Sequence, residues 1–171
     1  DVLVDQFYQQ QTSVAEIALL IGDADTLSRL QKAQRKYVLD MFSGIYDLEY
    51  ANNRLRIGLV HKRIGVEPKL YLAAIGSLKA LINELIRKSV EGQLEIQSTL
   101  ASLDKLYLFD ITLVFETYIR SLVSEIQIAK DKSEHYARTL EEKVKQRTAQ
   151  MEEMMRTDAL TGLLNVRYLP E

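Results

Sequence analysis

The sequence has 171 residues, 47% of them hydrophobic and 27% charged, and its formal net charge is −2. This length and balance fit one ordinary globular domain with an appended segment, and the small charge gives no general attraction to nucleic acid or an anionic membrane. The absence of cysteine excludes disulfides, thiolate metal sites and cofactors attached through cysteine.

Apolar residues recur at spacings of three and four along most of the chain, and alternating strand patterns are missing. Two prolines and seven glycines also leave little room for the turns of a β-fold. We therefore predict an all-α fold. No apolar run is long enough to cross a membrane and no signal peptide is evident, so we expect a cytoplasmic protein without membrane contact. Because Asp1 opens directly into an apolar pattern, we expect the natural chain to begin earlier.

The first predicted helix covers residues 2–20 and ends at the Gly22-Asp23-Ala24-Asp25 segment. Asp25 or Thr26 is then expected to cap a second helix, which stops near Ser43-Gly44. The core of that second helix is predicted from its apolar positions, which are Leu27, Leu30, Tyr37, Val38, Met41 and Phe42.

A third helix is expected over residues 48–64, with Gly65 in the left-handed position that often ends a helix. Pro68 suits the first turn of a fourth helix, which continues to about Val90. After Gly92, the sequence has no glycine or proline from Gln93 to Thr161, which predicts one very long helical stretch.

The first half of this stretch is apolar and aromatic, whereas the segment beyond Ala129 is rich in charge. A heptad register can be drawn through the charged half, with Lys130, Ser133 and Arg147 as polar interruptions. Its other seam positions are Ala137, Leu140, Val144, Met151 and Met154. We interpret residues 129–156 as a marginal coiled-coil linker.

His61 is one of two histidines, and Gly58 and Gly65 lie on the same predicted helix face at i−3 and i+4. Two glycines beside a histidine leave space for a flat ligand, and an imidazole within apolar walls suits a haem iron. The plainer alternative is a partly buried histidine with Gly65 acting only as a helix stop, and spacing alone favours it. His135 lies in a charged run and is interpreted as a solvated residue, not a ligand.

The wider segment YANNRLRIGLVHKRIGVEPKLYLAAIGSLKALI resembles the proximal region of globin-coupled sensors, which are bacterial haem sensors with a modified globin fold. The family pattern R-x-x-I-G-x-x-H-x-R-I-G-x-x-P-x-x-Y is matched in full. The resemblance covers most of residues 1–128 and implies a sensor globin domain that binds haem b non-covalently. It makes His61 the proximal ligand of the haem iron, with Gly58 beside it and Tyr71 able to form a hydrogen bond near this histidine.

The same resemblance places the distal side of the haem on the first two helices. Oxygen bound to ferrous iron carries negative charge on its outer atom, so a nearby O–H donor stabilises it. Tyr8 matches the family's distal tyrosine, and O₂, CO and NO are the expected ligands. Leu30 and Gln34, or its neighbour Ala33, match the family's other distal positions. On spacing alone, an ordinary core tyrosine is the better interpretation of Tyr8, and packing roles explain Leu30 and Gln34 at least as well.

The last residues, RTDALTGLLNVRYL, resemble the opening of a GGDEF domain, which reads D-x-L-T-G-L-x-N-R-R. Asn165 matches a guanine-contacting residue, and Val166 replaces the first arginine. The resemblance implies that residues 157–171 are the truncated start of a diguanylate cyclase domain, which would use Mg²⁺ and GTP to make cyclic di-GMP. The catalytic loop of such a domain would lie beyond Glu171, so we expect no catalytic residue in this chain.

Residues 67–90 and 94–128 carry larger apolar faces than one small globin core needs. We therefore expect a homodimer packed through these two helices, with ligand binding in the sensor rearranging the dimer. Two alternatives stay open: a haem sensor attached to another output, such as a chemoreceptor or kinase, and a globin-like signalling module without haem. A purely structural helical bundle is a third, and it would leave the GGDEF-like ending unexplained.

Overall fold

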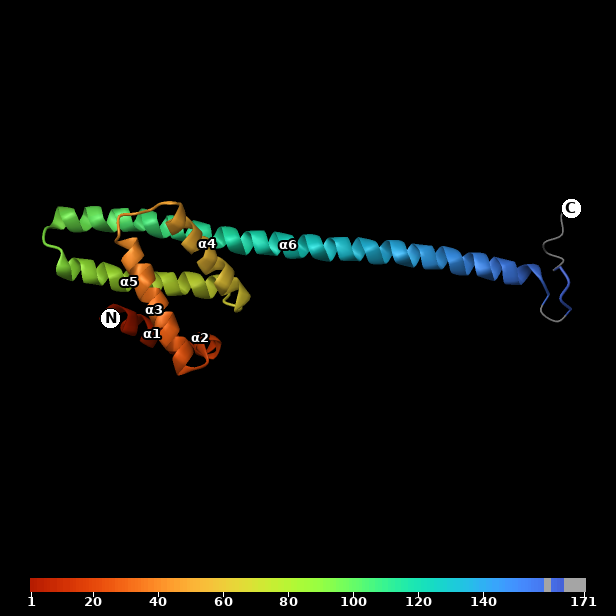
Figure 1. The fold of residues 1–171 in the computed structure, drawn as a ribbon, viewed down its shortest axis with the longest axis horizontal. Helices are drawn as coiled ribbons and strands as arrows, with labels where there is room; N and C mark the ends of the chain where they lie inside the picture. The colour runs from red at the N-terminus through yellow and green to blue at the C-terminus, as the bar shows by residue number, and fades with distance from the viewer. Residues whose placement is uncertain (159–160, 165–171) are drawn as a thin grey trace. The chain divides into compact units, whose positions relative to one another are not determined.

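The computed structural model describes residues 1–158 and 161–164, which are almost entirely helical (Figure 1). The helices in chain order are α1 (Val2–Thr12), α2 (Ala15–Ile21), α3 (Ala24–Met41), α4 (Leu48–Arg63), α5 (Pro68–Ser89) and α6 (Gln93–Arg156). Within the described ranges there is no strand, and Thr157 and Leu164 form an isolated β-bridge. The predicted all-α class is confirmed.

The chain divides into two compact units, Asp1–Ser121 and Leu122–Glu171. The first unit contains α1 to α5 and the beginning of α6. The second contains the remainder of α6 and the bridge between Thr157 and Leu164. None of the described helices has the length and apolar character required to cross a membrane.

The first predicted helix is in fact two helices, so the prediction of one helix over residues 2–20 was wrong. The hydroxyls of Thr12 and Ser13 donate to the carbonyls of Tyr8 and Gln10, at 2.8 and 2.7 Å. Such side-chain bonds compete with the backbone ladder at the end of a helix. Val14 then takes an extended conformation and α2 starts at the next residue.

The caps of α3 and α4 are aspartates that accept a backbone N–H through their side chains. Asp23 accepts from Thr26 N at 2.6 Å and so caps α3, which corrects the expectation that Asp25 or Thr26 does so. Asp47 accepts in the same way from Tyr50 N at 3.0 Å at the start of α4. In both helices the capping residue lies immediately before the first helical residue, where its oxygen reaches the third amide.

The end of α4 is a glycine-terminated motif, as the sequence predicts. Gly65 has a φ of +81°, its N–H donates to Lys62 O, and the N–H of Val66 donates to His61 O at 2.9 Å. This pair of bonds is the Schellman arrangement, which satisfies the last carbonyls of a helix. It fixes the backbone of His61, and Pro68 begins α5 three residues after Gly65.

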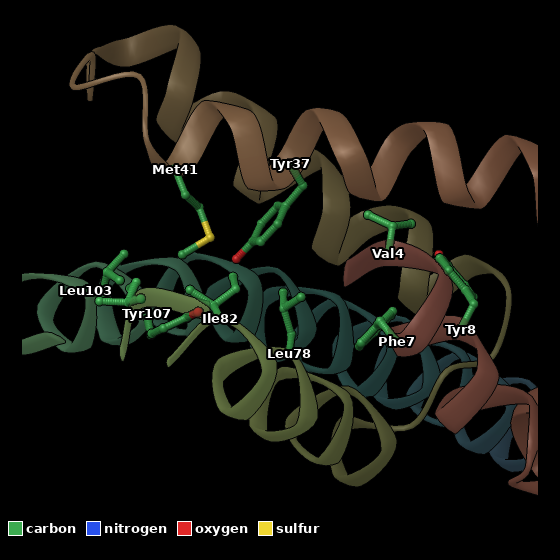
Figure 2. Close-up of a cluster of buried hydrophobic side chains, with 10 residues drawn as sticks. Val4, Phe7, Tyr8, Tyr37, Met41, Leu78, Ile82, Leu103 and Tyr107 are labelled. Carbon is green, nitrogen blue, oxygen red and sulfur yellow. The ribbon is translucent and has the colours of Figure 1, made fainter. Parts of the chain in front are cut away.

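The core of the first unit is assembled from four helices. Figure 2 shows Phe7 and Tyr8 on α1, with Tyr37 and Met41 on α3 and Leu78 on α5. Ile82 on α5 meets Leu103 and Tyr107 on α6 in the same cluster. A second, smaller cluster joins Tyr71 on α5 to Val114 and Tyr118 on α6. These contacts hold α1, α3 and α5 around a cavity, and α4 completes the wall of this cavity with His61.

Candidate functional site

His61 lies near the end of α4 and its side chain is partly buried. Its Nδ1 is 2.8 Å from the backbone carbonyl oxygen of Ile57. A carbonyl only accepts, so Nδ1 carries the proton and donates it to this bond. Burial lowers the pKa of the imidazole and so favours the neutral ring, and the smaller effect of the hydrogen bond to Ile57 opposes this. Nε2 is therefore left with a lone pair that can ligate a metal.

A cavity of about 420 Å³ lies beside His61 in the first unit. Its wall contains six of the residues that the sequence analysis named, which are Tyr8, Leu30, Ala33, Gln34, His61 and Tyr71. They come from α1, α3, α4 and α5, so the fold brings together positions that are far apart in sequence. The volume lies within the range of small-molecule and cofactor sites.

Tyr8 brings a hydroxyl to this cavity. The residue is buried, and none of the described residues forms a hydrogen bond with its hydroxyl. Burial raises the pKa of the phenol to about 12, so the group stays protonated at neutral pH and can donate. By contrast, Tyr37 and Tyr50 both use their hydroxyls inside the protein, where they donate to Asp110.

Leu30, Ala33 and Gln34 all line the cavity from α3. Leu30 and Gln34 are both partly buried and lie four residues apart, on one face of the helix. The alternative between Ala33 and Gln34 is therefore not decided by position, although only Gln34 offers a polar group.

Tyr71 touches His61 through its ring. The two ring centroids are 5.5 Å apart and the planes meet at 70°, which is an edge-on contact. The hydrogen bond that orients His61 comes instead from the Ile57 carbonyl. This differs from the expectation that Tyr71 forms the hydrogen bond near the histidine, because Nδ1 is already occupied within its own helix.

Gly58 has a different role from the one expected. A Cβ at this position would overlap the Thr117 hydroxyl and lie 2.8 Å from the carbonyl oxygen of Val114, both on α6. The missing side chain thus allows α4 to approach α6, and Gly58 does not line the cavity. The prediction that it clears space beside His61 was wrong. For Gly65 the plainer alternative holds, since its positive φ ends α4.

A buried charged cluster next to the cavity was missed at the level of sequence. Arg54 on α4 donates from Nε to Oδ2 of Asp110 on α6 at 2.9 Å, and both residues are at most 1% exposed. The hydroxyls of Tyr37 and Tyr50 donate to the same carboxylate at 2.7 and 2.9 Å. The guanidinium also lies about 4 Å from both of these tyrosine ring centres.

Two opposing effects act on the pKa of Asp110. Burial raises it, while Arg54 and the two tyrosine hydroxyls stabilise the carboxylate and oppose that rise. One signal could have revealed the cluster: Asp110 is the single charged residue within the apolar run LYLFDITLVF. A charge there needs a buried partner.

Three further positions were singled out in the sequence, which are His135, Asn165 and Val166. His135 is exposed on α6, in keeping with its interpretation as a solvated residue. Asn165 and Val166 fall outside the residues that the structure describes.

Three comparisons with known proteins bear on this site. The sequence profile of the Protoglobin family matches residues 1–124. A curated relative, the heme-based aerotactic transducer HemAT of Halobacterium salinarum, is 31% identical in an alignment of 136 positions that covers 74% of this chain and 28% of that protein. The solved globin domain of the Geobacter sulfurreducens globin-coupled sensor matches with a TM-score of 0.64 at 22% identity, over 68% of this chain and 76% of the other. This last likeness establishes a shared globin fold.

Proposed function

The chain belongs to the protoglobin family, and on that premise we propose that it is a haem-based gas sensor domain that regulates an attached output domain. The observation that carries the proposal is the state of His61. It is a neutral imidazole with Nδ1 held by a backbone carbonyl, on the wall of a cavity of about 420 Å³. An orienting bond of this kind is what metal-ligating histidines ordinarily have.

The residues present fit a haem b group held without covalent attachment. Nε2 of His61 would be the iron ligand, and the apolar side chains of Leu30, Ile57 and Leu78 would cover the macrocycle. Lys36 and Arg56 also line the cavity and are exposed, which suits the carboxylates of a tetrapyrrole. When bound, ferrous haem supplies reversible binding of O₂, CO or NO. Tyr8 would offer its O–H to such a gas ligand.

The response of the protein would then pass from α4 to α6. Gly58 and Arg54 both lie on α4, and both meet α6, at Thr117 and Asp110. A movement of His61 would shift α4 and therefore change these two contacts, because close-packed helices move together. We expect a population shift between two arrangements of a homodimer built from residues 67–90 and 94–128. Exposed apolar residues on both helices, such as Leu85 and Leu108, support that interface.

The output proposed is a diguanylate cyclase. It rests on the likeness of residues 157–171 to the opening of a GGDEF domain, with residues 129–156 as the linker and Asn165 as a guanine contact. The sensor would itself be non-catalytic, and Mg²⁺ and GTP would serve only the cyclase domain. A second candidate output is a chemotactic transducer, because the curated relative carries that description while this chain spans only 28% of its length.

The absorption spectrum of the purified protein tests the haem proposal. We expect a Soret band that shifts when the reduced protein is exposed to O₂ or CO. A protein that stays colourless after haem supplementation during expression would favour the alternative, a globin-like signalling module without haem. Assay of the full-length protein for cyclic di-GMP synthesis, with and without O₂, tests the output. Equal rates in the two conditions would contradict the proposed coupling.

A further inference from the structure

A run of three glutamines, Gln9 to Gln11, follows Tyr8 on α1, and the three residues differ in their exposure to solvent. Gln9 and Gln10 are exposed, whereas only 6% of Gln11 is exposed. Gln11 comes three residues after Tyr8 and four after Phe7, which places all three on one face of the helix. Like Tyr8, it lines the cavity beside His61.

The amide of Gln11 has no hydrogen-bond partner among the described residues. Four polar or charged residues are buried among those the structure describes, and three of them, Arg54, Asp110 and Thr117, form hydrogen bonds within the protein. The side chain of Gln11 forms none with any described residue. The fully buried side-chain atoms without a partner among the described residues are Oδ1 of Asn83 and the hydroxyl of Tyr107, and neither residue is in the cavity wall. The amide of Gln11 is not one of them, because it keeps contact with the open space that it lines.

An amide that forms no hydrogen bond with a described residue adds nothing to packing that leucine or methionine would not supply at this position. The amide is therefore free to bond to a polar molecule in the cavity. The carboxylates of a tetrapyrrole have cationic partners in Lys36 and Arg56, which are exposed members of the same wall. A neutral amide in the cavity wall, on the same helix face as Tyr8, is better suited to a small, weakly polar ligand.

We propose that Gln11 is a second ligand-binding residue of the cavity, whose amide N–H donates to the same diatomic gas ligand as the Tyr8 hydroxyl. The inference rests on the proposed haem function and adds a residue that sets the selectivity between gases. A donor of this kind stabilises O₂, whose outer atom gains negative charge, more than it stabilises CO. Gln11 would therefore favour O₂.

The test replaces Gln11 with methionine, which nearly preserves its shape, and compares Gln10→Met as the matched control on the exposed side of α1. Gln11→Leu serves as a second variant if the first does not fold. Haem content, from the Soret band, is measured first. The O₂ and CO dissociation rates are then measured by stopped-flow spectroscopy, and the apo-proteins are compared by urea denaturation.

We expect Gln11→Met to keep its haem, to release O₂ about fivefold faster, and to release CO at the rate of the wild type. Its apo-protein should be about as stable as the wild type, because the substitution removes no hydrogen bond to a described residue. Gln10→Met should match the wild type throughout.

Three results would overturn the inference. Haem retention with an unchanged O₂ rate would show that Gln11 does not contact the ligand. Loss of haem in Gln11→Met alone would make it a contact to the cofactor itself, and destabilisation of the apo-protein would make it a structural residue. A wild type that binds no haem would instead overturn the proposed function, and the inference would fall with it.

Discussion

At the scale of single residues, the side chain of His61 is held by a hydrogen bond to the Ile57 carbonyl of its own helix. Burial lowers its pKa in the folded protein, so the unfolded chain binds more protons near pH 6. The stability of the apo-protein should therefore be complete above the unfolded pKa of about 6.5 and fall as the pH drops below it. One titrating group contributes at most about 1.4 kcal/mol per pH unit.

This dependence is measurable by urea denaturation of the apo-protein between pH 7.5 and 5. His61→Ala should flatten the profile, whereas His135→Ala, which removes an exposed histidine, should leave it as in the wild type. Parallel profiles for the wild type and His61→Ala would contradict the burial of a neutral imidazole.

Tyr8 and Tyr37 make a second pair for comparison. The Tyr8 hydroxyl has no partner among the described residues, while that of Tyr37 donates to Asp110 at 2.7 Å. Tyr8→Phe should leave the stability of the apo-protein within about 0.5 kcal/mol of the wild type and release O₂ about tenfold faster. Tyr37→Phe should lose about 1–3 kcal/mol, because it leaves a lone pair of a buried carboxylate unpaired. Equal losses of stability would contradict these assignments.

Gly58 gives a prediction about packing. Because a Cβ at this position would overlap Thr117 and crowd Val114 O, Gly58→Ala should destabilise the protein by about 1–3 kcal/mol. Gly76→Ala on α5 is the control, since a Cβ there meets no neighbouring atom and alanine is the better helix former. Thermal unfolding followed by circular dichroism compares the two. A neutral Gly58→Ala would mean that α4 and α6 are not in close contact.

At the scale of elements, the Arg54–Asp110 pair joins α4 to α6. Asp110→Leu should cost about 3–5 kcal/mol, because it leaves the Arg54 charge buried without its partner. Adding Arg54→Met to this variant should recover part of the loss, which a double-mutant cycle measures. Lys79 and Asp104 form a partly exposed ion pair at 2.8 Å. Lys79→Met, which breaks this pair, should lower the free energy of unfolding by less than about 1 kcal/mol. Equal costs for the two pairs would contradict the importance of burial.

Much of this arrangement could be predicted from the sequence. Gly65 marks the C-terminal end of α4 and Pro68 marks the start of α5, and both signals are local in the sequence. The pattern around His61 identifies one wall of the cavity through family resemblance. The break at Ser13 was missed because it depends on hydroxyls bonding to their own helix. The role of Gly58, the pairing of Arg54 with Asp110 and the burial of Gln11 depend on which helices meet, and spacing along one helix does not contain that information.

At the scale of the whole molecule, the proposed homodimer predicts that a substitution in the interface can abolish association without affecting haem binding. Leu108→Lys places a charge on an exposed apolar position of α6 and should convert dimer to monomer in sedimentation experiments while leaving the Soret band unchanged. Leu39→Lys on α3, also exposed, should leave the association state as it is. A Leu108→Lys protein that associates like the wild type would place the interface elsewhere.

The proposed gas sensing by this protein depends on ligation of haem by His61, which is measured by titration of haem into the apo-protein. Wild type and His135→Gly should both reach a stoichiometric end point with the same Soret band. His61→Gly should bind weakly with an altered spectrum, and added imidazole should restore the wild-type band by replacing the missing ligand. If His61→Gly instead binds haem with the affinity and spectrum of the wild type, His61 is not the ligand and the proposed haem site is wrong.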